Sequence, residues 1–171
     1  GAPLSNHIAR EKKLPLGTTA RLLLDVAGAL TAAHSHGIIH RDLKPDNILV
    51  AGPADEPSVK VIDFGVARAT GGDIAATSLR TNIGQLVGTL YYMSPEQVEA
   101  DPGALDQRSD VYSLGVVLHE LVTGRLPYEL AGLPMLEMAR VIRDAPPTPV
   151  TATRHGLLAD VDTITAKALE K

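Results

Sequence analysis

Three polar residues in one short segment have side chains suited to a single reaction. The segment is His40-Arg41-Asp42-Leu43-Lys44-Pro45-Asp46-Asn47. The carboxylate of Asp42 can accept the proton of a hydroxyl that attacks a phosphoryl group, and Lys44 can neutralise the charge that develops there. Asn47 can offer a neutral carbonyl oxygen to Mg²⁺. A polar turn between a helix and a strand could have the same composition, so further motifs decide the interpretation.

Two more motifs follow in a fixed order. Asp63-Phe64-Gly65 comes directly after the β-branched run 59–62, which is typical of a strand that runs into a turn. Between Asn47 and this turn lie a first strand, over 48–50, and a turn-rich loop, over 51–57. Farther along the chain, Gly88-Thr89 precedes Ser94-Pro95-Glu96.

Together these motifs resemble those of the serine/threonine protein kinases, and their residues are most similar to those of bacterial members of the eukaryotic-type kinases. The resemblance covers nearly the whole chain. It implies a mainly α fold, the helical C-lobe of the kinase domain, with a small β-hairpin near the catalytic loop and no N-lobe in this chain. Residues 1–171 would be one C-lobe fragment, with the catalytic loop at 40–47 and the activation segment at 63–96.

The resemblance assigns the chemistry to a few residues. Asp42 would be the catalytic base, and the Thr89 hydroxyl would bridge it to Lys44. Because tyrosine kinases lack both that Lys and that Thr, the substrate hydroxyl is expected on Ser or Thr of a protein. The expected cofactors are ATP and Mg²⁺, and Mn²⁺ could take the place of Mg²⁺. Asn47 and Asp63 would supply oxygen ligands to the metal, and Leu49 would form the floor under the adenine ring.

Other residues have structural or regulatory roles in the family. His40 would pack near Phe64, which lies with Gly65 in the turn after the second strand. Asp110 would accept hydrogen bonds from backbone N–H groups around His40 and Arg41. Arg41 would pair with a phosphate on the activation segment, for which we prefer Thr81 to Thr77 or Ser78, with an unmodified threonine as the alternative. Glu96 lacks the family's Arg partner in this sequence. Its partner would lie beyond residue 171, or it is unpaired.

Composition narrows the classes of function and partner. The formal charge of −4 gives no sign of a nucleic-acid surface, and the absence of cysteine excludes disulfides and thiolate zinc sites. No apolar run reaches the roughly 20 residues of a membrane span, so we expect a cytoplasmic location, with any membrane anchor of the parent outside this segment. Dimerisation or autophosphorylation of the parent is also compatible with the resemblance. A metal cluster of His34, His36 and His40 is disfavoured because no carboxylate or cysteine completes it in sequence.

Apolar spacing and breakers predict the elements that position these residues. Helices are expected over 3–12, 19–36 with Thr18 as cap, 95–100, 106–123, 134–143 and 157–169, and a hairpin over 48–50 and 59–62.

The sequence contains neither a G-x-G-x-x-G loop nor a V-A-I-K-like strand with its phosphate-gripping lysine. We therefore expect this chain alone to be nearly inactive, as half of an ATP-dependent kinase. The alternatives are a non-catalytic binding module with a kinase-like fold and a gene fragment without a function of its own.

Overall fold

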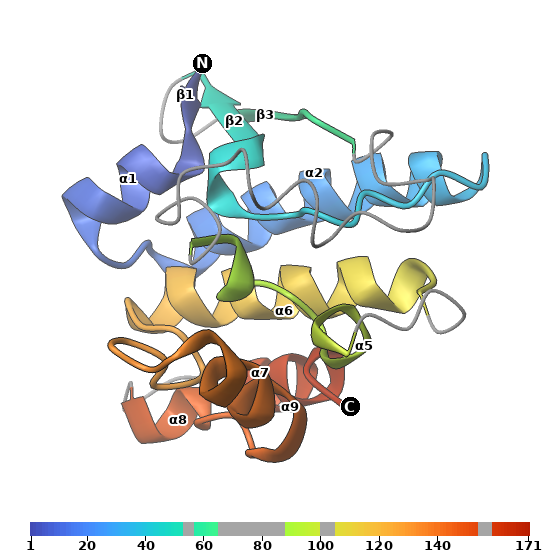
Figure 1. Cartoon of the computed structure of the whole chain (residues 1–171). Coiled ribbons are helices and arrows are strands. Elements are labelled where there is room, and N and C mark those ends of the chain that lie inside the picture. Colours follow the sequence, from blue (N-terminus) through green and yellow to red (C-terminus); the bar gives the residue numbers. More distant parts are fainter. Residues whose placement is uncertain (53–56, 65–87, 100–104, 154–158) are drawn as a thin grey trace.

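A computed structural model describes residues 1–52, 57–64, 88–99, 105–153 and 159–171. Within these ranges the chain is mainly helical and carries one small sheet near its N-terminus (Figure 1). The elements in chain order are β1 (Ala2–Pro3), α1 (Leu4–Glu11), α2 (Leu16–His34), the 3₁₀ turn η1 (Pro45–Asn47), β2 (Ile48–Ala51), β3 (Ser58–Val61), α5 (Pro95–Val98), α6 (Gln107–Thr123), α7 (Met135–Asp144), α8 (Val150–Thr153) and α9 (Ala159–Ala168).

The predicted hairpin is present as β2 and β3, which pair antiparallel with Ile48 opposite Val61. The structure adds β1, which pairs antiparallel with the other edge of β2 and places Pro3 opposite Leu49. The prediction that the first helix begins at Pro3 is therefore wrong, since Pro3 lies in the edge strand β1 and the helix begins at Leu4. A proline is tolerated at an edge because its missing N–H has no ladder partner to lose.

Helix α6 lies in the middle of the molecule, between α2 above it and α7 and α9 below it (Figure 1). It begins at an aspartate cap, since the Asp106 carboxylate accepts the N–H of Arg108, and it ends at Gly124 in the left-handed conformation. Gly115 permits the close approach of α9, because a Cβ at this position would lie 2.8 Å from the Cβ of Ala168. Both predicted ends of this helix hold.

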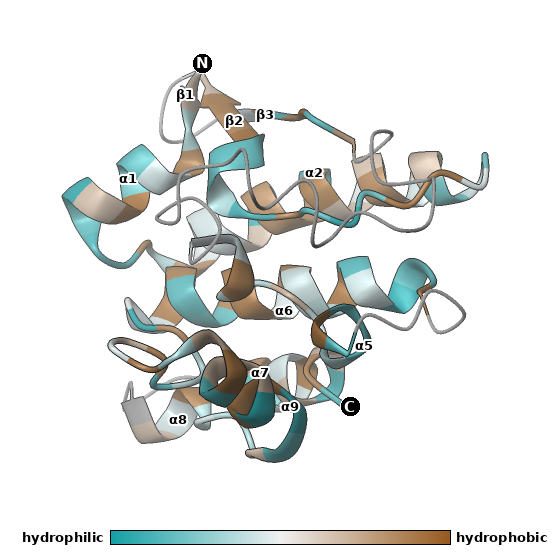
Figure 2. Ribbon diagram, in the orientation of Figure 1, coloured by the Kyte–Doolittle hydropathy of each residue, from teal (hydrophilic) through white to brown (hydrophobic). Residues whose placement is uncertain are grey.

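Two apolar cores flank α6. The upper core joins α1, α2, the sheet and one side of α6; its buried members are Leu4, Leu14, Leu22, Leu23, Val26, Leu30, Leu43, Ile48, Val50, Val61, Val117 and Leu121. The lower core joins the other side of α6 to α7 and α9; its members are Leu90, Met93, Tyr112, Val116, Tyr128, Leu130, Met138, Ile142 and Leu169. Figure 2 shows hydrophobic residues along β2 and within α2 and α6, whereas η1 is hydrophilic.

Helix α2 begins earlier than predicted. It starts at Leu16 after Pro15, and no side chain caps it, so Thr18 is not its cap. Thr19 is instead fully buried within the helix. Pro15 just before the helix has an extended backbone that sets the direction of the chain, and no side chain caps the helix, which is why a polar cap does not mark its start.

Candidate active site

The catalytic loop is anchored to α6 through a buried carboxylate. Asp110 is 0% exposed and accepts the backbone N–H of His40 at 2.8 Å and that of Arg41 at 2.8 Å. These are the two bonds that the family resemblance led us to expect. His34 Nε2 adds a third contact to the same carboxylate at 2.7 Å. The carboxylate thus holds the backbone just before Asp42 in one place.

His40 connects this loop to the strand β3 side of the site. Its Nδ1 accepts the N–H of Asp42 at 3.3 Å, and its Nε2 contacts the carbonyl of Ile62 at 2.9 Å. The ring also packs on Phe64, with centroids 4.7 Å apart. Because a backbone N–H only donates and a carbonyl only accepts, the ring proton lies on Nε2. His40 therefore serves as a structural bridge in this geometry.

Asp42 and Lys44 lie together with the hydroxyl of Thr89. Lys44 Nζ is 3.1 Å from Asp42 Oδ2 and donates to Thr89 Oγ1 at 2.8 Å. The bridge expected of Thr89 is thus made by the ammonium group of Lys44, which lies between the carboxylate and the hydroxyl. Thr89 comes from a segment 45 residues farther along the chain. The fold therefore assembles a proton acceptor, a positive charge and a hydroxyl at one point.

Asn47 is oriented by its own amide. Its Nδ2 donates to the backbone carbonyl of Asp42 at 2.8 Å, so its oxygen is the atom left for a cation. The backbone carbonyl of Asn47 accepts the N–H of Ile62 at 2.9 Å, which brings the residue before Asp63 to the catalytic loop. Asp63 is exposed and has a φ of 58°. A neutral amide oxygen and an exposed carboxylate from adjacent segments form a donor set suited to Mg²⁺.

Leu49 is half-buried in β2, while its neighbours Ile48 and Val50 are buried in the upper core. This alternation is the one predicted for a strand with one face toward the core. Leu49 therefore presents its side chain on the face opposite the core, beside Pro3 of β1. Gly65 and Thr81 lie outside the described residues, and so do Thr77 and Ser78.

Glu96 has a partner that the sequence did not suggest. The hydroxyl of Ser109 donates to its carboxylate at 2.5 Å. A serine at the start of α6 thus satisfies the acid at the start of α5, so the alternative that Glu96 is unpaired is wrong, while an Arg partner beyond residue 171 stays a prediction. A compact hydroxyl suffices here because α5 lies close to the first turn of α6 (Figure 1).

A second carboxylate near the loop was not anticipated. Glu120 accepts a hydrogen bond from the hydroxyl of Tyr92 at 2.6 Å, and burial raises the pKa of Glu120 while that bond opposes the rise. Burial also raises the pKa of Tyr92, with the charge of Glu120 acting in the same direction. Ser5 donates to Asp46 of the loop at 2.6 Å. In the sequence, Glu120 lies on an apolar helix at a position where the helical spacing predicts a buried residue. This spacing is the feature from which a buried carboxylate could have been predicted.

A metal-binding cluster and a membrane-spanning helix are both absent from the described residues. Among the residues whose positions are given, no three His, Cys, Asp or Glu side chains cluster as they would to hold a metal ion, and this includes the histidines of α2 and the loop. Within the same ranges, no helix has the length and apolarity needed to cross a bilayer.

The mainly helical fold with its small sheet is that of a protein kinase C-lobe. Comparison with known families agrees, because residues 1–147 match the family described as the protein kinase domain. The chain belongs to the protein kinase family.

The chain is similar over nearly all of its length to serine/threonine-protein kinases of several bacteria. Pkn1 of Myxococcus xanthus is 40% identical over all of this chain and 23% of its own length. PknB of Mycobacterium leprae is 37% identical over all of this chain and 26% of its length. PknL of Mycobacterium tuberculosis is 39% identical over 98% of this chain and 39% of its length. The chain thus spans about a quarter to two fifths of these relatives.

Proposed function

We propose that the protein transfers the γ-phosphoryl group of ATP to Ser or Thr hydroxyls of proteins. The observation that carries this proposal is the position of Lys44 Nζ, 3.1 Å from the Asp42 carboxylate and 2.8 Å from the Thr89 hydroxyl. The names of the relatives, all serine/threonine-protein kinases, support it. A binding module would have no need to bring these three groups together.

In the proposed reaction, the substrate hydroxyl oxygen forms a bond to the γ-phosphorus as the bond to the ADP oxygen breaks. The hydroxyl proton passes to the Asp42 carboxylate. Lys44 offsets the negative charge of the phosphoryl oxygens, while Thr89 fixes the ammonium group from the opposite side. Positioning and charge stabilisation supply most of the rate in such transfers.

Asn47 and Asp63 would hold Mg²⁺, or Mn²⁺ in its place, with phosphate oxygens and waters completing the ligands. The metal would neutralise charge on the phosphates of ATP. Leu49, on the strand face opposite the core, would lie under the adenine ring. The rest of the nucleotide site would need a Gly-rich loop and a phosphate-binding lysine, neither of which occurs in these 171 residues.

We therefore assign residues 1–171 to the C-lobe, with the catalytic loop at 40–47 and the activation segment at 63–96. Without the upper half of the cleft, these residues alone should transfer phosphate many orders of magnitude more slowly than a complete kinase domain. A cytoplasmic site of action, where ATP is abundant, fits this activity. Dimerisation and autophosphorylation remain predictions for the full-length protein.

Arg41 and Thr81 would form the regulatory pair. A phosphate on Thr81 could accept charge-assisted hydrogen bonds from the Arg41 guanidinium and fix the activation segment. Phosphopeptide mass spectrometry of active protein should find Thr81 modified. Active protein with Thr81 unmodified throughout would remove this residue from the proposal.

The test of the main proposal is transfer of label from γ-labelled ATP, with Mg²⁺, by the full-length protein. The expected products are labelled protein, either itself or a generic basic acceptor, and phosphoserine or phosphothreonine after acid hydrolysis. The 171-residue chain measured alongside should give little label. No transfer by the full-length protein would favour the binding-module alternative, and phosphotyrosine would contradict the substrate assignment.

A further inference from the structure

One contact ties the catalytic loop to the short helix α5, and no motif foretold it. The side-chain amide of Gln97 donates from Nε2 to the backbone carbonyl of Arg41 at 2.6 Å. The same amide accepts the N–H of Ser94 through Oε1 at 2.9 Å. Gln97 lies 56 residues from Arg41 in sequence, so the contact depends on tertiary structure.

These partners fix the identity of the side chain. A backbone carbonyl only accepts and a backbone N–H only donates, so position 97 must supply one donor and one acceptor on neighbouring atoms. Glutamine supplies both in one planar group, which also fixes the orientation of its amide. Glutamate would keep the acceptor for Ser94, as in a usual capping box, but would face the Arg41 carbonyl with a second oxygen.

The contacted carbonyl belongs to the peptide that links Arg41 to Asp42. The N–H of that same peptide donates to His40 Nδ1 at 3.3 Å. The preceding peptide N–H, on Arg41, is held by Asp110 at 2.8 Å. Arg41 has a φ of 64°, a left-handed conformation that a non-glycine residue keeps only when its surroundings hold it. Gln97 supplies the hold on the side that faces α5.

We propose that Gln97 is a positioning residue, which clamps the Arg41–Asp42 peptide and thereby sets the direction of the Asp42 carboxylate. This inference rests on the proposed kinase function. Through the clamp, docking of α5, at the end of the activation segment, is coupled to the geometry of the base. A rotated peptide would move Asp42 away from the attacking hydroxyl while leaving the nucleotide site unchanged.

Gln97→Glu in the full-length protein separates the clamp from the helix cap, because it retains the acceptor for Ser94 and removes the donor to Arg41. The matched control is Glu99→Gln, at the end of the same helix. The native Glu99 side chain is exposed, and its contact with Arg143 is long, at 3.9 Å, so its loss should matter little. We expect Gln97→Glu to lower kcat by about tenfold to a hundredfold, with the KM for ATP changed by less than about twofold. The control should match the wild type.

Two readouts distinguish a clamp from a merely structural role. As the pH falls and the introduced carboxyl group takes up a proton, it can donate to Arg41 again, so the ratio of variant kcat to wild-type kcat should rise. Amide hydrogen exchange should be faster at Arg41 and Asp42 in Gln97→Glu than in Glu99→Gln. Should Gln97→Glu fold poorly, the uncharged Gln97→Met serves; it removes the acceptor for Ser94 as well as the donor to Arg41, with the same expected loss of kcat and faster exchange at Arg41 and Asp42.

A kcat within about twofold of the control, or unchanged exchange at Arg41 and Asp42, would overturn the clamp. A full-length wild-type protein that transfers no phosphate would overturn the proposed function instead. In that event the exchange rates alone decide whether Gln97 holds the loop.

Discussion

The upper and lower cores share α6, yet different polar groups connect them to it. On the upper side, the carboxylate of Asp110 accepts two backbone N–H groups of the catalytic loop. On the lower side, the hydroxyls of Tyr112 and Tyr128 lie 3.1 Å apart, and the ring of the buried His119 contacts the backbone carbonyls of two segments outside the active site, at Arg125 and Thr148. The upper contacts fix a backbone that carries chemistry, whereas the lower contacts fix where segments lie. Substitutions in the two regions should therefore differ in kind.

The largest expected effect is that of Asp42→Ala on catalysis. Removal of the proton acceptor should lower kcat by about 10²- to 10⁴-fold, while the free energy of unfolding changes little because the carboxylate is only partly buried. The measurements are the initial rate of phosphoryl transfer by the full-length protein with Mg-ATP and its thermal melting. Asp25→Asn, an exposed acid on α2, is the control and should keep full activity. Retained activity in Asp42→Ala would contradict the assignment of the base.

Asp110→Asn should affect both stability and activity. The new NH₂ group cannot accept from a backbone N–H, so one of the buried N–H groups of His40 or Arg41 loses its partner, at a cost of about 3 kcal/mol. Denaturant unfolding and initial rate give the two effects.

Asp106→Asn is the matched control, since it removes the same charge one turn earlier on α6. Asparagine also caps helices well, so its expected change in unfolding free energy is small. Equal losses in both variants would mean that Asp110 acts only as a charge near the helix start.

His119→Leu tests the lower region. The ring is 0% exposed, and its nitrogens lie 2.8 Å from the carbonyl of Arg125 and 2.9 Å from that of Thr148. Leucine would leave these carbonyls without the ring, which should lower the free energy of unfolding by about 2 kcal/mol. Below the melting temperature kcat should not change. A loss of kcat in fully folded protein would show that the two regions are coupled.

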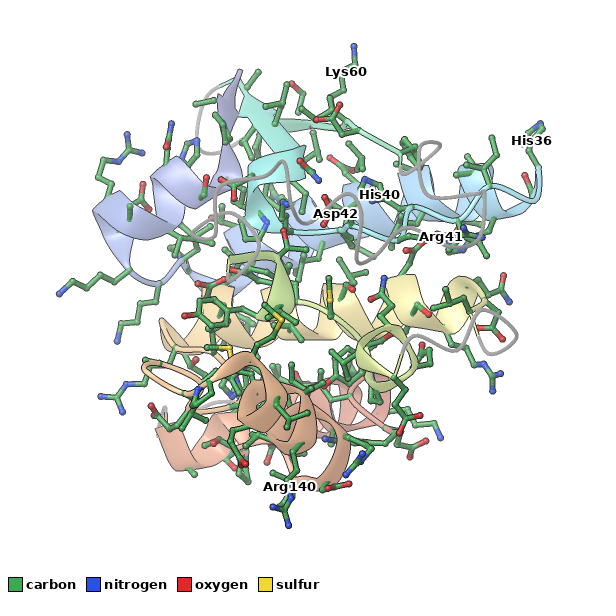
Figure 3. All side chains as sticks on the ribbon, in the orientation of Figure 1. His36, His40, Arg41, Asp42, Lys60 and Arg140 are labelled. Carbon is green, nitrogen blue, oxygen red and sulfur yellow. The ribbon has the colours of Figure 1, made fainter. Side chains whose placement is uncertain are left out.

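The control for this variant is His36→Leu. Figure 3 shows His36 at the edge of the molecule, whereas His40, Arg41 and Asp42 lie on one stretch of chain in its middle. The side chain of His36 is exposed, so neither stability nor activity should change measurably.

The smallest expected effect is a pH dependence from Glu120. Burial raises its pKa above the ordinary value of 4.5. The folded state therefore holds this proton more tightly than the unfolded state, and the stabilisation is full below pH 4.5 and is lost as the pH rises through the folded-state pKa. Glu120→Gln lacks this loss, so its melting temperature should rise relative to the wild type above pH 4.5. A difference in melting temperature between Glu120→Gln and the wild type that stays constant from pH 4 to 8 would contradict this prediction.

Local patterns were enough to predict much of the fold, whereas the residues of the site were predicted from the family resemblance. The limits of α6 followed from an apolar helical period between an aspartate and a glycine. The hydrogen bonds from Asp110 to the loop followed from family resemblance, since nothing in residues 106–123 alone points to His40. The pairing of β1 could not be predicted, because two residues with a proline carry no strand period.

Partners of single polar residues were the least predictable part. Glu96 receives the hydroxyl of Ser109, and Tyr92 donates to Glu120 across 28 residues of sequence. Gln97 contacts a backbone carbonyl, for which a sequence offers no distinctive residue type at all. Such contacts depend on which surfaces meet after packing, and spacing along the chain does not encode this.

The bonds from Asp110 to the loop also fix an order of events during synthesis. The backbone N–H of His40 must wait for a residue 70 positions later, and the upper core waits for Val117 and Leu121 of the same helix. At a synthesis rate of about 5 to 20 residues per second, this delay is roughly 4 to 14 s. Until α6 leaves the ribosome, the apolar side chains of α2 and the sheet have no partner on that side. The nascent chain is then exposed to chaperones and proteases, and slower codons between the loop and α6 would lengthen that exposure.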